Sequence, residues 1–203
     1  MKQIIRHHFL KLSSTQDWAK THATAIPADR WLLITTDQQT KGRAVRDAIW
    51  LSPPDVNIYA TFALRFPVIK SQLLIHLPQI TALAICQTLE GFAIQPKIKW
   101  INDVLINHKK VAGVLCESQP LNQTQLAVFI GIGLNVNMSK SACDKIDQPA
   151  TSLLIETNRY HDKEIILHSI GNNLQHVIQI LLNEGFAPLQ MEINKFCIYN
   201  DNE

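Results

Sequence analysis

The most restrictive feature of this sequence is a pair of strand-like segments joined by a very short connection. Residues Val111–Glu117 and Gln125–Val136 are rich in apolar and β-branched side chains, and a polar turn around Pro120 to Thr124 links them. A crossover between parallel strands needs about a dozen residues or more, so we expect this pair to be antiparallel. The chain therefore cannot consist only of parallel strands alternating with helices.

Other segments predict further strands and helices around this pair. Strands are expected at Ile4–Leu12, Trp31–Thr36, Asn57–Phe66 and Ile98–Ile106. Ser13 and Gln16 fit a capping box, so a helix should follow and end at about His22. Two more helices are expected, one from near Pro78 to Leu89 and one over Asp162–Leu182. We predict a single α+β domain over residues 1–203, with a central mixed, largely antiparallel sheet flanked by helices.

Composition excludes several classes of protein. Nineteen basic residues against seventeen acidic ones give a net charge of +2, which is not the footprint of a nucleic-acid-binding protein. The four cysteines lie singly along the chain, so neither a zinc site nor a disulfide framework is indicated. No uninterrupted apolar run approaches the roughly 18 residues of a membrane span, and the N-terminus does not fit a secretory signal. We therefore expect a cytoplasmic protein that contacts no membrane.

Four groups of polar residues, most of them beside a glycine, lie at the edges of apolar segments. They are Ser14-Thr15 with Gln39–Arg43, then KWIND at residues 99–103, KVAGVL at residues 110–115 and GIGLNVN at residues 131–137. Their order and spacing resemble the biotin protein ligase family, and so do Ser14-Thr15-Gln16, the loop Gly42–Trp50 and Ala150–Leu153. The resemblance runs from about residue 8 to residue 190. It implies the fold of biotin and lipoate ligase catalytic domains, which is like that of class II aminoacyl-tRNA synthetases.

The resemblance also implies a reaction. Biotin and ATP with Mg²⁺ would give biotinyl-5′-AMP and pyrophosphate, and an acceptor lysine would then take the biotin. The acceptor would resemble the biotin carboxyl carrier protein of acetyl-CoA carboxylase, whereas nothing in the sequence indicates the oligomeric state. A lipoate or octanoate ligase or transferase is an alternative with the same fold, although KWIND and the Ser-Thr-Gln triplet favour biotin. A non-catalytic biotin-binding protein is a second alternative.

Residues with the right chemistry for biotin occur in these motifs. A ureido ring offers one carbonyl acceptor and two N–H donors, which short hydroxyl and amide side chains such as Ser14, Thr15 and Gln39 can match. Adenylation brings two anions together, so it needs cations, and Lys110 and Arg43 are suited to this. The resemblance adds Gly42 and Gly113, where the backbone could approach a small ligand. On the residues alone, Ser14 and Thr15 could merely cap a helix, and Lys110 could be a solvated strand-end lysine.

The resemblance places a nucleotide beside the biotin. Trp50 could lie over the adenine, and Arg46, Asn102 and Asn135 would contact the nucleotide. Asp103 is the candidate ligand for Mg²⁺ and the candidate to help the acceptor lysine lose its proton. A plain Asn-Asp turn remains an alternative for Asn102 and Asp103.

The loop Gly42–Trp50 departs from the family pattern. Where the family has GRGRRGRKW, this chain has GRAVRDAIW. Arg43 and Arg46 are retained, whereas Ala44 and Asp47 replace glycines and Val45 and Ala48 replace arginines. Fewer side chains can then hold the adenylate, so we expect poor retention of it. We also recognise no helix-turn-helix segment and no small β-rich C-terminal domain, and expect no repressor function.

Overall fold

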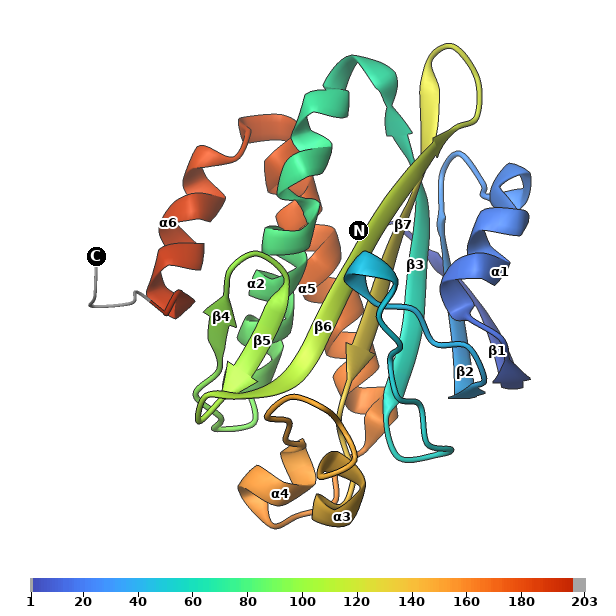
Figure 1. The fold of residues 1–203 in the computed structure, drawn as a ribbon. Helices are drawn as coiled ribbons and strands as arrows, with labels where there is room; N and C mark the ends of the chain where they lie inside the picture. The colour runs from blue at the N-terminus through green and yellow to red at the C-terminus, as the bar shows by residue number, and fades with distance from the viewer. Residues whose placement is uncertain (1, 199–203) are drawn as a thin grey trace.

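A seven-stranded sheet forms the centre of the computed structural model, which describes residues 2–198 apart from the side chain of Asp47 (Figure 1). Its strands lie in the order β1-β2-β3-β7-β6-β5-β4. β1 and β2 pair in parallel, and each of the other neighbouring pairs is antiparallel. The predicted mixed, largely antiparallel sheet and the antiparallel pairing of β6 with β7 are therefore confirmed. The strands are β1 Ile4–Leu12, β2 Trp31–Gln39, β3 Ile58–Pro67, β4 Lys97–Lys99, β5 Asp103–Ile106, β6 Lys109–Pro120 and β7 Gln125–Leu134.

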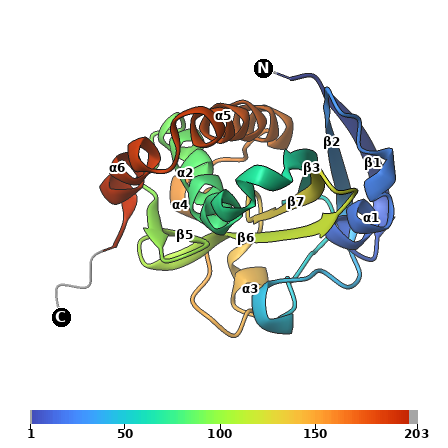
Figure 2. The ribbon, with the colours of Figure 1, turned by 90° about the horizontal axis from the view of Figure 1, so that it is seen from above.

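Helices cover the two faces of the sheet unequally. Figure 2 shows α2, α5 and α6 side by side on one face, with α1 on the other near β1 and β2. Short 3₁₀ turns occupy Ala23–Ala25, Val45–Asp47 and Val68–His76. The α-helices are α1 Thr15–Thr21, α2 Leu77–Glu90, α3 Lys140–Cys143, α4 Leu153–Thr157, α5 Lys163–Glu184 and α6 Ala187–Phe196.

Both faces of the central strands are buried. Phe62 of β3 packs in the large core under α2 and α5, while the next residue, Ala63, packs in a smaller core under α1. Successive side chains of a strand point to opposite faces, which explains why β3 has apolar side chains on both of its faces. α1 has only seven residues, so it covers one part of its face and leaves the rest to form a cleft.

The segment Val68–Glu90 is long and apolar enough to cross a membrane by length and composition. Its α2 part is the core helix, since most of its residues are buried, and its strongest helix contacts are with α5. Burial in the protein core therefore accounts for the apolar character of α2, whereas no residue of the turn Val68–His76 is buried.

Two local predictions were wrong. The N-cap of α1 is Ser14 rather than Ser13, because Ser14 is extended (φ −158°, ψ 133°) and its hydroxyl accepts from the backbone N–H of Asp17. The expected strand Ile98–Ile106 is a hairpin of β4 and β5, with a turn at residues 100–102. Asp103 accordingly begins β5 instead of lying within one continuous strand.

Candidate functional site

A cleft opens on the face of the sheet that carries α1. Its walls come from the N-terminus of α1, from β3, β6 and β7, and from the loop Gly42–Trp50, which Figure 1 shows crossing in front of the strands. Predicted residues that line it are Ser14, Thr15, Gln39, Arg43, Trp50, Asn102, Lys110 and Gly113. The fold thus gathers residues that are up to about a hundred positions apart in the sequence.

Three glycines on adjacent strands form the floor of the cleft. Gly113 of β6 pairs with Gly133 of β7, and Gly131 lies on the same face two residues before Gly133. A Cβ atom on Gly133 would lie 2.3 Å from the Trp50 indole, and one on Gly131 would lie 2.7 Å from Gln16 Oε1. The glycines therefore make room for side chains. Gly113 also lines the cleft, and a Cβ atom there would lie 2.8 Å from the Trp50 ring, so its expected approach to a ligand stays a prediction.

Uncharged hydrogen-bonding groups gather at the α1 end of the cleft. Gln39 Oε1 accepts from the Thr15 backbone N–H at 3.0 Å and from the Thr15 hydroxyl at 3.2 Å. Gln39 Nε2 donates to the Ser52 hydroxyl at 3.2 Å. Ser14 caps α1 and lines the cleft as well, so capping does not remove it from the cleft.

Thr61 and Gln16 belong to this network, although the sequence analysis did not select them as site residues. Thr61 Oγ1 lies 2.9 Å from Thr15 Oγ1 and 3.1 Å from Gln16 Oε1. Gln16 Nε2 donates to the carbonyls of Leu115 and Phe129, which hold the amide against β6 and β7. The fully buried Thr61 within an apolar strand was a usable signal, because a buried hydroxyl needs a partner.

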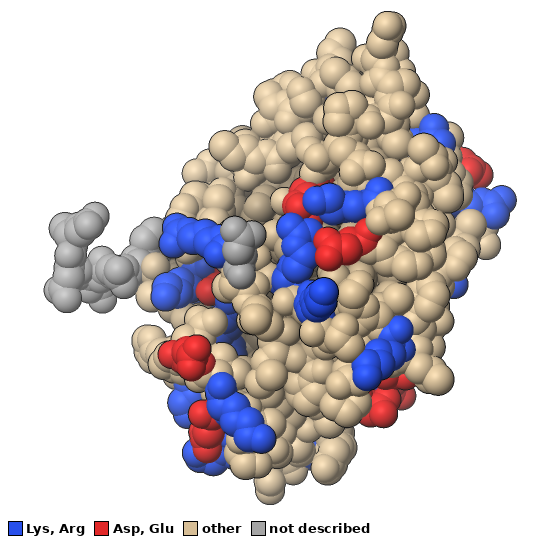
Figure 3. Space-filling model, turned by 45° about the vertical axis from the view of Figure 1, so that its right-hand side comes forward, with Lys and Arg blue, Asp and Glu red and all other residues tan. Residues whose placement is uncertain are grey.

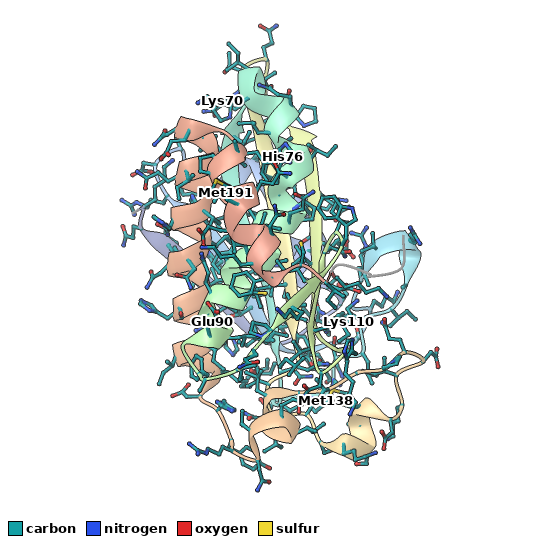
Figure 4. All side chains as sticks on the ribbon, turned by 90° about the vertical axis from the view of Figure 1, so that its left-hand side faces the viewer. Lys70, His76, Glu90, Lys110, Met138 and Met191 are labelled. Atoms are coloured by element: carbon teal, nitrogen blue, oxygen red, sulfur yellow. The ribbon has the colours of Figure 1, made fainter. Side chains whose placement is uncertain are left out.

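Lys110 lies at the other end of the cleft and is paired with a carboxylate. Its Nζ is 2.7 Å from Asp103 Oδ1, and the two side chains are only 14% and 19% exposed. Lys110 is thus not a solvated strand-end lysine. Figure 4 shows it on the side of the sheet away from α5. The Nζ also lies 5.5 Å from the centre of the Trp50 ring. The indole N–H of Trp50 is buried and has no hydrogen-bond partner among the described residues, so no hydrogen bond fixes the ring there.

Arg43 is held by two carboxylates from different elements. Its Nη1 donates to Asp17 Oδ1 of α1 at 2.8 Å and to Glu117 Oε2 of β6 at 3.0 Å, and its Nη2 donates to Glu117 Oε1 at 3.2 Å. Lys20 also donates to Glu117, at 2.7 Å. Burial alone would raise the pKa of Glu117, but hydrogen bonds from Lys20 and Arg43 outweigh it and hold that pKa below its ordinary value. The hydrogen bond to Glu117 is the main reason that the pKa of Arg43 is raised.

A second cavity adjoins the cleft, and Trp50 and Lys110 line both. Asn135 lines this second cavity, whereas Asn102 lines the first, so the structure does not place the two amides together. Asn135 is buried and donates to the Thr151 carbonyl at 3.0 Å. Asn102 donates to the Val114 carbonyl at 3.0 Å. Both side-chain amides therefore donate hydrogen bonds to the backbone of the protein.

The loop Gly42–Trp50 folds as a small hairpin with few ties to the rest of the protein. Trp50 N–H donates to the Gly42 carbonyl at 3.0 Å, and Ala44 N–H donates to the Ala48 carbonyl at 2.8 Å. Gly42 is required because a Cβ there would lie 2.4 Å from the Trp50 carbonyl oxygen. Arg46 is exposed near the tip with a left-handed backbone (φ 59°). The side chain of Asp47, a position where the sequence analysis noted a lost glycine, lies outside the described structure.

Comparisons with known proteins show what this chain is similar to. The chain is 34% identical over 182 residues to the bifunctional ligase/repressor BirA of Bacillus spizizenii, covering 89% of this chain and 55% of that protein. It is 32% identical over 186 residues to the biotin–[acetyl-CoA-carboxylase] ligase of Paracoccus denitrificans, covering 89% of this chain and 75% of that protein. It thus spans about half the length of the first of these relatives.

The fold has close structural neighbours as well. The biotin protein ligase of Aquifex aeolicus, solved with biotin and ATP, superposes with a TM-score of 0.78 at 26% identity, over 98% of this chain and 80% of that one. The family model for the biotin/lipoate A/B protein ligase family matches residues 10–135. The predicted family and fold are thereby confirmed: the chain belongs to the biotin/lipoate A/B protein ligase family.

Proposed function

We propose that this chain, in the cytoplasm, joins biotin to ATP as biotinyl-5′-AMP and then transfers the biotin to a lysine of a biotin carboxyl carrier protein. The observation that carries the proposal is the polarity of the cleft. Uncharged donors and acceptors of Thr15 and Gln39 lie at the α1 end, where the charge of Arg43 is already paired with carboxylates. Lys110 lies at the other end, where the second cavity begins. A ligand with a ureido ring at one end and a carboxylate at the other matches this order.

The first step joins two anions. A biotin carboxylate oxygen bonds to the α-phosphorus of ATP, and the bond from that phosphorus to the bridging oxygen of pyrophosphate breaks. Lys110 is on the boundary of both cavities, so its charge can neutralise the carboxylate and the developing phosphorane together. Trp50 lines both cavities too and offers a flat surface for an adenine. Asn102, Asn135 and Arg46 stay our candidates for further nucleotide contacts.

The second step needs a neutral amine. The acceptor lysine loses a proton, its nitrogen bonds to the biotinyl carbonyl carbon, and AMP leaves with the electrons of the anhydride C–O bond. Asp103 is our candidate to assist the proton loss, since it is a partly buried carboxylate beside Lys110.

Asp103 would also hold Mg²⁺, which neutralises phosphate charge when bound. Among the described residues no cluster of three or more His, Cys, Asp or Glu side chains could hold a metal ion. A single carboxylate fits Mg²⁺ only if ATP phosphates and water complete its octahedral shell. The donor set of this site therefore suits a metal that arrives with the nucleotide.

The relatives support biotin over lipoate as the substrate. The Aquifex aeolicus enzyme was solved with biotin and ATP, and the Paracoccus denitrificans relative is named for ligation of biotin to acetyl-CoA carboxylase. A non-catalytic biotin-binding protein is favoured by one observation, namely that the loop over the cleft has Ala44, Val45 and Ala48 where the family pattern has glycine and arginine.

The test has two stages. Calorimetric titration with biotin and with lipoate measures which ligand binds, and we expect biotin alone to bind. Pyrophosphate release with ATP and streptavidin detection of a carrier domain then measure catalysis, with a carrier lacking its acceptor lysine as the control. Binding without pyrophosphate release would identify a non-catalytic binder, and preferential binding of lipoate would refute the proposal.

A further inference from the structure

We propose that Glu117 and Asp17 are positioning residues, which hold the guanidinium of Arg43 so that its unused edge faces the ligand as a two-pronged donor. The proposal deepens the proposed function and rests on it. Neither carboxylate needs to touch the ligand, because both act through Arg43.

The argument begins with the donors of Arg43. A guanidinium has five N–H donors arranged along its edges. Both N–H groups of Nη1 are used, one by Asp17 and one by Glu117, and one N–H of Nη2 is used by Glu117. No hydrogen bond within the described structure uses the Nε–H. The Nε–H and the second Nη2–H lie along the same edge, so together they form a pair of nearly parallel donors.

Arg43 is well placed to present this edge. Its side chain lines the cleft and is 34% exposed, so the guanidinium has access to a ligand there. Glu117 is only 21% exposed and is held in turn by Lys20 at 2.7 Å. Its low pKa keeps this acceptor ionised at neutral pH. Glu117 belongs to β6 and Asp17 to α1, so the side chain of Arg43, a loop residue, is held by the sheet and by a helix.

The composition of the loop makes this anchoring more important here. Val45 and Ala48 have no side-chain donors, and Arg46 is exposed near the tip. Arg43 is therefore the one arginine of the loop that lines the cleft in the described structure. A long side chain loses conformational freedom when it binds a ligand, and an arginine that is already ordered has less to lose.

Charge and position predict opposite results for one substitution, which makes a sharp test. Glu117→Gln removes a negative charge near the cleft, so electrostatics alone predicts tighter binding of an anion. If Glu117 positions Arg43, the same substitution weakens binding, because an amide cannot accept from both Nη atoms and from Lys20. The probe is chemically prepared biotinyl-AMP, and the measurement is its dissociation rate from the full chain.

We expect Glu117→Gln to speed dissociation about tenfold, as for the loss of one charged hydrogen bond, and Asp17→Asn to speed it about threefold. Biotinyl-AMP should dissociate from Arg43→Ala at least as fast as from Glu117→Gln. From the double variant it should dissociate no faster than from Arg43→Ala. Unchanged or slower dissociation in Glu117→Gln would overturn the proposal, and so would effects of Glu117→Gln and Arg43→Ala that multiply.

A matched control uses the pair Arg6–Glu164, another arginine held by a glutamate, which lies across the sheet from the cleft. Glu164→Gln should leave dissociation unchanged. Denaturant unfolding identifies variants that lose their fold. If Glu117→Gln loses its fold, Asp17→Asn tests the proposal instead, because the side chain of Asp17 is 48% exposed. If the wild type binds biotinyl-AMP but releases no pyrophosphate, the catalytic proposal fails and this test still stands. If the wild type binds neither biotin nor biotinyl-AMP, both fail.

Discussion

The floor of the cleft and the loop that walls it are built in different ways. The floor consists of sheet positions on β6 and β7, and the neighbouring amide of Gln16 is tied to backbone carbonyls of both strands. The loop Gly42–Trp50 instead closes mainly on itself and is tied to the rest chiefly through Arg43. The rigid part keeps the family pattern and the loop departs from it. The proposed recognition of biotin and the proposed retention of its adenylate should therefore be separable by mutation.

Lys110 should give the largest effect, because it is the cation of the cleft that the sheet itself carries. Lys110→Ala removes a charged hydrogen bond and leaves Asp103 without its partner, so we expect a loss on the order of 1.5–3 kcal/mol in biotinyl-AMP binding or in adenylation. Arg43→Ala should lose less, since two carboxylates already offset that charge. Titration calorimetry and pyrophosphate release measure both variants.

The control for this comparison is Lys109→Ala, which removes an exposed lysine from the neighbouring position of β6. It should leave binding and catalysis unchanged. A larger loss in Arg43→Ala than in Lys110→Ala would mean that the loop, and not the sheet, carries the main charge of the site.

The packing of the floor can be tested with Gly131, and Gly171 on α5 provides the control. In Gly131→Ala the new Cβ lies 2.7 Å from Gln16 Oε1, so the amide must move and lose hydrogen bonds. We expect the free energy of unfolding to fall by roughly 1–3 kcal/mol, with weaker biotin binding. Gly171→Ala on α5 meets its nearest atoms at 3.4 Å or more, and should stabilise the helix by up to about 1 kcal/mol. Equal changes in the two variants on urea unfolding would show that the floor is not tightly packed.

Patterns local in sequence predicted most of the fold. The short connection between β6 and β7 determined their antiparallel pairing, and helical spacing located α2 and α5 to within a residue or two. The hairpin at residues 97–106 was missed because the apolar pattern runs through its turn, which is held by a contact from Asn102 to Val114, twelve residues away. The cap of α1 was misplaced by one residue because Ser13 and Ser14 have the same capping chemistry, and only backbone conformation distinguishes them.

Many residues of the candidate site could also be predicted from the sequence, but the hydrogen bonds and ion pairs between them could not. Motifs selected eight of the residues that line the cleft. The partners of Arg43 lie 26 and 74 residues away in sequence, and Thr61 meets Thr15 across 46 residues. Such contacts depend on strand register, which no local pattern specifies. The ion pairs of Arg43 and Lys110 therefore emerged only from the fold.

The loop can be changed in the direction of the family pattern. Val45 lines the cleft and is 46% exposed, so Val45→Arg returns a donor fork without filling buried space. We expect biotinyl-AMP to dissociate about fivefold more slowly, or roughly 1 kcal/mol, because the new hydrogen bond is partly solvated. Ile69→Arg, at an 84% exposed position on the turn Val68–His76, controls for the added net charge. Equal dissociation rates in Val45→Arg and the wild type would show that the loop does not hold the adenylate here.

The smallest effect concerns acid stability and compares Glu117 with Glu164. Ion pairs hold the pKa of each carboxylate below its ordinary value of 4.5, for Glu164 mainly through hydrogen bonds from Arg6 and for Glu117 through Lys20 and Arg43 against the opposing effect of burial. A group with a lowered folded pKa stabilises the fold above the unfolded value, and this stability is lost as the pH falls through the folded pKa. Glu117→Gln should therefore lower the free energy of unfolding by about 1 kcal/mol at pH 7, and this difference should shrink as the pH falls below about 4.5.

Glu164 is 65% exposed, so Glu164→Gln should lower the free energy of unfolding by under about 0.5 kcal/mol, and this difference should vanish in high salt. On the one face of the molecule that Figure 3 shows, acidic and basic side chains adjoin one another. Urea unfolding at pH 7 and pH 4, in low and high salt, measures both differences, and a Glu117 difference that grows toward acid pH would contradict the assigned direction of its pKa.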